Sequence, residues 1–171
     1  MVRFGVAILI MMLPTLNSCL HRETGLNMKA PALTKLLDRG LQSGHFESKP
    51  SATWISDMSH LERIYARMGK STLFDVRGNS PTPDFSREGV LLVEMGQKST
   101  GGYRLDLIEG LSSIAEGTAE VTLSWIEPPP GTILPQVITS PWILITLSRG
   151  DYSLINVLDQ DGQLRLELIV K

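Results

Sequence analysis

The alternation of apolar and polar side chains from Glu88 onward constrains the fold of this chain more than any other feature. A period of two places successive side chains on opposite faces of a strand, so one face of each segment can join a core. Residues 90–95 and 142–147 are instead continuous apolar runs of strand length. With a short segment further upstream, these signals together predict strands at residues 52–55, 90–95, 103–107, 121–125, 142–147, 152–158 and 164–170. Asp161-Gly162 between the last two segments is a strong signal for a hairpin turn. Six or seven short strands with one packed helix predict a mainly β, α+β domain, built as an antiparallel sandwich or a barrel-like sheet.

The one packed helix is predicted between residues 57 and 69. Apolar residues there follow one another at spacings of three, four and seven, which defines one face of a helix: Met58, Leu61, Ile64, Tyr65 and Met68. Ser56 or Asp57 can cap its start, and Gly69 can end it.

The first residues have the pattern of a secretory signal. Arg3 supplies a positive charge, and the apolar run from Phe4 to Leu13 is too short for a membrane span, which needs about 20 apolar residues. Leu16-Asn17-Ser18-Cys19 then resembles a lipobox, the motif that directs lipid to a cysteine. The resemblance implies removal of residues 1–18, a diacylglyceryl thioether on Cys19 and, because Leu20 follows instead of aspartate, transport to the outer membrane. A plain signal peptide with a chance cysteine is the alternative.

Residues 19–50 are expected to form a lipidated tether that lets a β-rich domain of residues 51–171 stand away from the membrane. Pro31 is well placed to begin a short helix in this tether, with an apolar stripe made by Leu33, Leu36, Leu37 and Leu41. The chain has a single cysteine, so it has no intrachain disulfide to stabilise either part.

Composition and motifs exclude several classes of function. A net charge of -2 at pH 7 gives no electrostatic footprint for nucleic acid. The three histidines lack the spacing of metal ligands, and neither a Gly-x-Ser-x-Gly elbow nor a complete P-loop is present. Asp159-Gln160-Asp161-Gly162 begins like a calcium loop, but Val170 stands where the final glutamate belongs. No catalytic residue, metal or cofactor is therefore predicted, and an enzyme is the least supported class.

The segment from Met95 to Tyr103 is the most informative loop. A strand ends at Gly96, polar residues follow, and Gly101-Gly102 precede an aromatic residue that opens the next strand. Adjacent glycines permit positive φ and the close approach of another backbone. The alternative is a plain hairpin loop in which Tyr103 packs into the core.

Several segments together resemble the C-terminal domain of the PrcB family, named for a lipoprotein subunit of a bacterial surface protease complex. They are Asp84-Phe85-Ser86-Arg87-Glu88, the strand Gly89-Val90-Leu91-Leu92-Val93, Gly96 with Thr100-Gly101-Gly102-Tyr103, and Ser140-Pro141-Trp142 after a proline-rich loop. The resemblance covers roughly residues 50 to 150. It implies a protein that is exported, often lipid-anchored and associated with a protease.

A second, weaker similarity is to chagasin-type inhibitors of papain-like proteases, which carry three contact loops on an immunoglobulin-like scaffold. Thr100, Gly102 and Tyr103 match one of those loops, and Pro141-Trp142 match another. The similarity implies contact with a protease through two loops at one end of a sandwich.

The first functional hypothesis is a non-catalytic, lipid-anchored module that binds an exported protease or another envelope protein. Aromatic side chains beside glycines on a rigid scaffold suit recognition, provided that both loops lie side by side on an accessible rim. The predicted contact residues are Lys98, Ser99, Thr100, Gly101, Gly102, Tyr103, Ser140, Pro141 and Trp142. A chagasin-like protease inhibitor is the alternative, and a structural envelope lipoprotein is a third hypothesis.

Overall fold

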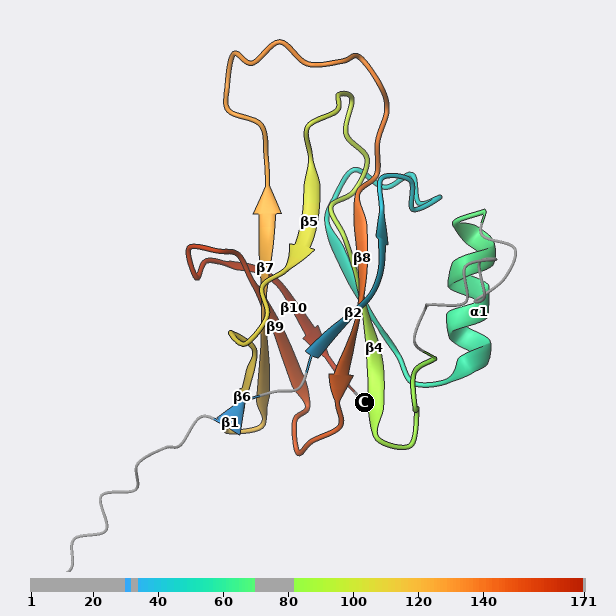
Figure 1. Cartoon of the computed structure of the whole chain (residues 1–171), viewed down its shortest axis with the longest axis vertical. Helices are drawn as coiled ribbons and strands as arrows, with labels where there is room; N and C mark the ends of the chain where they lie inside the picture. Colours follow the sequence, from blue (N-terminus) through green and yellow to red (C-terminus); the bar gives the residue numbers. More distant parts are fainter. Residues whose placement is uncertain (1–29, 32–33, 70–81, 171) are drawn as a thin grey trace, which may run out of the picture.

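The computed structural model describes residues 30–31, 34–69 and 82–170 and contains, within these ranges, ten strands and one helix (Figure 1). The strands are β1 (Ala30–Pro31), β2 (Thr34–Gly40), β3 (Ser51–Ile55), β4 (Glu88–Glu94), β5 (Arg104–Leu107), β6 (Ser113–Ala115), β7 (Thr118–Ile126), β8 (Trp142–Ser148), β9 (Leu154–Leu158) and β10 (Leu164–Ile169). The helix α1 (Met58–Arg67) follows β3. Predicted segments 90–95, 121–125, 142–147 and 164–170 correspond to β4, β7, β8 and β10.

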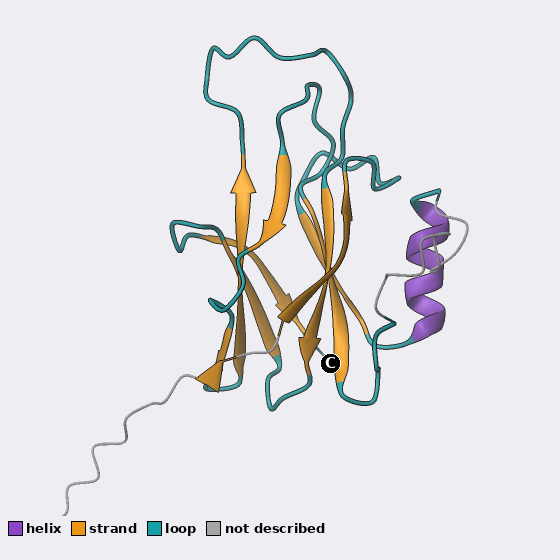
Figure 2. Ribbon diagram, in the orientation of Figure 1, coloured by secondary structure: helices purple, strands orange, loops and turns teal. Residues whose placement is uncertain are grey.

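The strands form two sheets that pack face to face (Figure 2). The four-stranded sheet has the order β2-β8-β4-β3 and is antiparallel throughout. The six-stranded sheet has the order β1-β6-β7-β9-β10, with β5 also paired to β7. Its β7 and β9 are parallel, because the chain crosses to the other sheet through β8 before returning. The prediction of a mainly β sandwich with one helix is confirmed, whereas a closed barrel is not formed by the described strands. The predicted antiparallel pairing holds for the described strand pairs except β7 with β9.

The four-stranded sheet is buried on both faces, which explains the continuous apolar runs of β4 and β8. Leu91, Val93 and Ile145 belong to the core between the two sheets. Val90, Leu92, Trp142 and Leu144 belong to a second core, which α1 covers from the other side. Successive residues of one strand thus serve two cores.

The helix was predicted in its correct place. The carboxylate of Asp57 caps its start by accepting a hydrogen bond from the backbone N–H of His60 at 2.8 Å. Leu61, Ile64 and Tyr65 are buried against the four-stranded sheet, on the face that the spacing of three and four defines. The helix packs along the outside of the sandwich (Figure 2).

The short helix expected from Pro31 is wrong. Residues Thr34–Gly40 form the strand β2, which pairs with β8. Leu36 packs against the core between the sheets, whereas Leu37 is buried in the core under α1, and the register shifts between Leu36 and Asp38. Leucines that resemble one helical stripe therefore serve both faces of a sheet, because pairing with β8 overrides the local preference. The sandwich consequently includes residues upstream of position 51.

The predicted signal peptide, residues 1–18, and the lipidation site Cys19 lie outside the described residues. None of the helical structure in the described ranges is long and apolar enough to cross a membrane.

The hairpin turn predicted at Asp161-Gly162 is confirmed, since β9 and β10 are antiparallel neighbours and Gly162 has φ of 77°. The carboxylate of Asp159 is buried beneath this turn. Its Oδ1 accepts hydrogen bonds from the backbone N–H groups of Asp161 and Gln163, both at 2.9 Å. Its Oδ2 accepts a hydrogen bond from Arg165 Nε at 2.7 Å. The segment that begins like a calcium loop is thus a turn held by its own acidic side chain.

Candidate functional site

Three loops gather at one end of the sandwich and are called here the three-loop end: residues 41–50, 96–103 and 127–141 (Figure 1). The longest of them, 127–141, joins β7 to β8 and rises furthest from the sheets. The first strand, β1, lies at the opposite end of the molecule.

The two predicted contact loops are joined directly by hydrogen bonds. Lys98 and Thr139 exchange both backbone bonds, with N–H···O distances of 2.7 and 2.9 Å. The hydroxyl of Thr139 donates to the carbonyl of Thr100 at 3.1 Å, and the N–H of Gly101 donates to the carbonyl of Pro135 at 3.1 Å. The two loops therefore lie side by side, which is one part of the geometric condition of the first hypothesis; the other part, accessibility, is not met by residues 140–142.

The paired glycines mark the place where the long loop crosses the short one. Gly102 has φ of 93°, in the left-handed region that favours glycine. A Cβ added there would lie 3.2 Å from the side chain of Leu134 and 3.3 Å from that of Pro128. Gly102 thus has the positive φ that the sequence predicts, but the close approach is made by side chains of the long loop and not by another backbone.

The third loop, residues 41–50, was not predicted to take part. The N–H of Ser140 donates to the carbonyl of Leu41 at 2.8 Å, and Gln42 Nε2 donates to the carbonyl of Ile138 at 2.8 Å. On its other side, Glu47 accepts from the backbone N–H of Gln97 at 2.8 Å. The loop is therefore bonded to both of the others.

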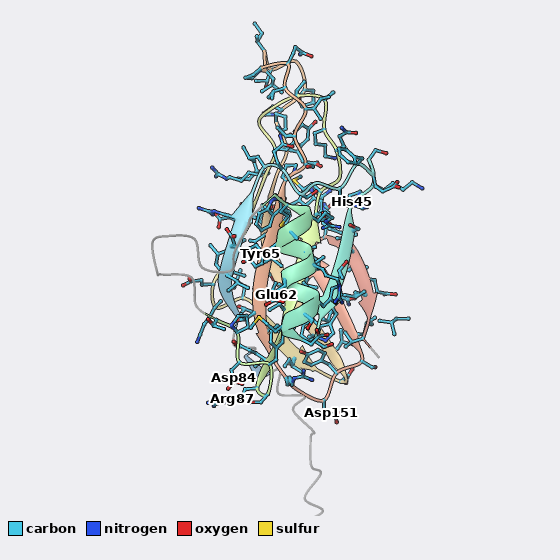
Figure 3. The ribbon with its side chains drawn as sticks, turned by 90° about the vertical axis from the view of Figure 1, so that its right-hand side faces the viewer. His45, Glu62, Tyr65, Asp84, Arg87 and Asp151 are labelled. Carbon is cyan, nitrogen blue, oxygen red and sulfur yellow. The ribbon has the colours of Figure 1, made fainter. Side chains whose placement is uncertain are left out.

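A buried carboxylate supports this third loop from below. Glu94, at the end of β4, is only 2% exposed, and its Oε1 accepts a hydrogen bond from Arg67 Nη2 at 3.0 Å. Its Oε2 lies 3.8 Å from His45 Nδ1 and 3.5 Å from Ser51 Oγ. Figure 3 shows His45 beside the end of α1. The carboxylate of Glu94 thus links the C-terminal end of α1 to the loop of residues 41–50.

The predicted residues of the first loop remain accessible in part. Ser99 and Gly102 are exposed, whereas Lys98, Thr100, Gly101 and Tyr103 are half-buried. Lys98 Nζ lies 5.2 Å from the centre of the Tyr103 ring, which itself packs against the core between the sheets. Tyr103 therefore has a structural role as well as an accessible part.

The predicted contact surface is wrong for Ser140, Pro141 and Trp142, because all three are buried. Trp142 is 1% exposed, packs in the core under α1, and donates from Nε1 to the carbonyl of Gln42 at 3.1 Å. Ser140 Oγ accepts from the N–H of Ser43 at 2.9 Å. These residues hold the loops in place and present no side chain to a partner.

Sequence reasoning missed the apolar side chains that the three-loop end does expose. They are Leu41, Phe46, Ile133, Val137 and Ile138, with exposures from 47% at Val137 to 99% at Ile133. One signal for part of this set was present in the sequence, since no charged residue occurs between Glu127 and Arg149. A charge-free stretch that is too rich in proline for a central strand predicts an exposed neutral loop.

Within the described residues, no group of three or more histidine, cysteine, aspartate and glutamate side chains could hold a metal ion. The three-loop end also carries charged, hydroxyl and aromatic side chains, among them His45, Phe46, Lys98, Thr100 and Tyr103.

The fold and this end define a class of protein: a two-sheet β sandwich with a surface of clustered loops at one pole. Residues 90–148 match the family model described as PrcB C-terminal, which confirms the resemblance inferred from the sequence. The matched range runs from β4 to the end of β8 and so contains two of the three loops completely. Comparisons with curated proteins and with solved structures gave no match.

Proposed function

We propose that this chain is a non-catalytic, lipid-anchored interaction module that binds an exported protein through its three-loop end. The observation that carries the proposal is the hydrogen-bonded union of the loops 96–103 and 127–141, which holds a set of exposed aliphatic side chains in fixed positions. Clustered apolar side chains on a soluble surface are typical of protein contact sites. The match to the PrcB C-terminal family favours a protein of a protease complex as the partner.

The chagasin-like alternative receives less support. One of its two matching segments is Pro141-Trp142, and both residues are buried. A tryptophan enclosed in the core under α1 offers no contact to a protease. Absence of inhibition of papain-like and subtilisin-like proteases at micromolar concentrations of this protein would remove the alternative.

The lipid anchor is tested by Cys19→Ser. We expect the wild-type chain to fractionate with the outer membrane and to incorporate a labelled fatty acid, because each buried CH₂ of an acyl chain contributes about 0.8 kcal/mol to membrane binding. The variant should lose the label. Ser18→Ala, which keeps a small residue before the cysteine, is the matched control and should remain labelled. Equal labelling of Cys19→Ser and wild type would refute lipidation at this position.

The interaction surface is tested by capture of envelope proteins on the purified chain, followed by their identification. Phe46→Ser and Gly102→Arg should each lower recovery of the partner at least fivefold, the first by removing an exposed ring and the second by displacing the loop that crosses Gly102. Ile169→Ser is the control, because Ile169 is 68% exposed on β10 and lies outside the three-loop end.

Circular dichroism should show that all three variants keep the fold. A partner recovered equally well with Phe46→Ser, Gly102→Arg and wild type would contradict the proposed surface. Loss of recovery with Ile169→Ser alone would move the site to the face of the six-stranded sheet.

A further inference from the structure

The long loop carries the most exposed large apolar residue of the three-loop end. Ile133 is 99% exposed, and its neighbours Val137 and Ile138 are 47% and 60% exposed. The segment 131–138, called here the tip segment, contains no charged residue. Enclosure of a fully exposed isoleucine side chain by a partner lowers the free energy of the complex, because apolar surface is removed from water.

The tip segment is held at both ends. Thr132 donates from its backbone N–H and from its hydroxyl to the carbonyl of Pro129, the latter at 2.8 Å. Pro135 accepts from the N–H groups of Gly101 and Val137. Prolines fix φ, and these bonds fix the two flanks, so little conformational freedom remains to be lost on binding.

Other parts of the tip segment have backbone groups without hydrogen bonds to the described residues. In the hydrogen bonds of the described residues, the peptide groups of Ile133, Leu134 and Gln136 have no intramolecular partner. A protein cleft can supply donors and acceptors to such groups, whereas the hydrocarbon of a bilayer cannot. The open backbone therefore favours a protein over a membrane as the occupant.

We infer that Ile133 is the anchor residue of the interaction surface and that the tip segment enters an uncharged, apolar cleft on a partner protein. This inference rests on the proposed function and specifies the partner's chemistry. Burial of one isoleucine side chain corresponds to a change of about 10- to 100-fold in affinity.

The experiment places a photoreactive amino acid at position 133, 46 or 169 of the full chain in living cells and identifies the cross-linked protein. We expect one protein to be captured from position 133 and not from position 169. With that protein purified, Ile133→Asp should weaken binding at least tenfold, while Ile133→Val and Ile169→Asp should stay within about threefold of wild type.

The outcomes separate the two proposals. Capture from position 46 without capture from position 133, or unchanged affinity of Ile133→Asp, overturns the role of Ile133 and leaves the three-loop end standing. If no protein is captured from position 133 or from position 46, both the role of Ile133 and the three-loop end as the interaction surface are overturned. Binding of the Cys19→Ser chain to vesicles of phosphatidylethanolamine and phosphatidylglycerol, abolished by Ile133→Asp and without a protein adduct, makes the membrane the occupant and overturns the inference.

Discussion

Replacement of Trp142 by alanine should lower the free energy of unfolding by about 3–5 kcal/mol, as is usual for large-to-small changes at buried aromatic positions. Trp142 is the largest of the side chains that are less than 2% exposed, and it fills the core between α1 and the four-stranded sheet. A Cβ at Gly40 would lie only 2.9 Å from its indole nitrogen, so the neighbouring strand is already in close contact with the ring. Urea denaturation followed by circular dichroism measures the change.

Trp142→Phe is the matched control. It retains an aromatic ring in the core but loses the hydrogen bond from Nε1 to the carbonyl of Gln42, and we expect it to cost about 1–2 kcal/mol. We therefore expect the buried ring to contribute more to the free energy of unfolding than its hydrogen bond does. A loss below 1 kcal/mol for Trp142→Ala would show that the side chain is not enclosed as described, and would reopen its role as a contact residue.

Replacement of Asp159 by alanine should lower the free energy of unfolding at pH 7 by about 2–4 kcal/mol, because three donors lose a charged acceptor. Two of them are backbone N–H groups, of Asp161 and Gln163, and the third is the guanidinium of Arg165. Asp159→Asn keeps one carbonyl oxygen for the turn but faces Arg165 with an amide, so about half of that loss is expected. Thermal and urea denaturation of the three proteins give the comparison.

The effect of Asp159 should depend on pH. Burial alone would raise the pKa of this carboxyl, but the hydrogen bonds from Gln163, Arg165 and Asp161, with the charge of Arg165, lower the pKa below its ordinary value. A carboxyl with a lowered folded-state pKa stabilises the fold above its unfolded-state pKa, about 3.9, and this stabilisation is lost as the pH falls through the folded-state value. The difference in unfolding free energy between wild type and Asp159→Asn should therefore be constant from pH 7 to about 5 and shrink below about pH 4. A difference that grows on acidification would contradict this assignment.

Much of the fold could be predicted because its signals are local. The strands β7 and β10 carry an alternating pattern, α1 carries one apolar face and a cap at Asp57, and Asp161-Gly162 specifies a hairpin turn. β1 and β6 were missed because they have two and three residues, too few for a period to show. β2 was missed for a different reason. Its adjacent residues Leu36 and Leu37 pack into different cores on the two faces of the sheet, and neither core can be recognised from the segment alone.

The candidate site, like the fold, was predicted only in those features that depend on local sequence. Positive φ and a close approach were correctly predicted at Gly102, but the approaching atoms are side chains and not the predicted backbone. Gly101 has neither property, because its φ is not positive and an added Cβ would make only ordinary contacts at 3.6 Å or more. The sequence left open whether Trp142 faces solvent or core, although the continuous apolar run that it opens is typical of a strand with two covered faces. Leu41 and Phe46 lay in a segment interpreted as a tether, so nothing linked them to the other loops.

The sequence alone determined the class of fold, the position of the helix and the turns, because the period of the side chains and the preferences of glycine and aspartate act over a few residues. Only the tertiary structure decided which loops meet and which apolar side chains stay in water. Those outcomes depend on bonds between distant residues, such as Gln42 with Ile138, which are 96 positions apart. No pattern within a strand or a turn encodes such a pairing, because it forms only when β2 pairs with the distant strand β8.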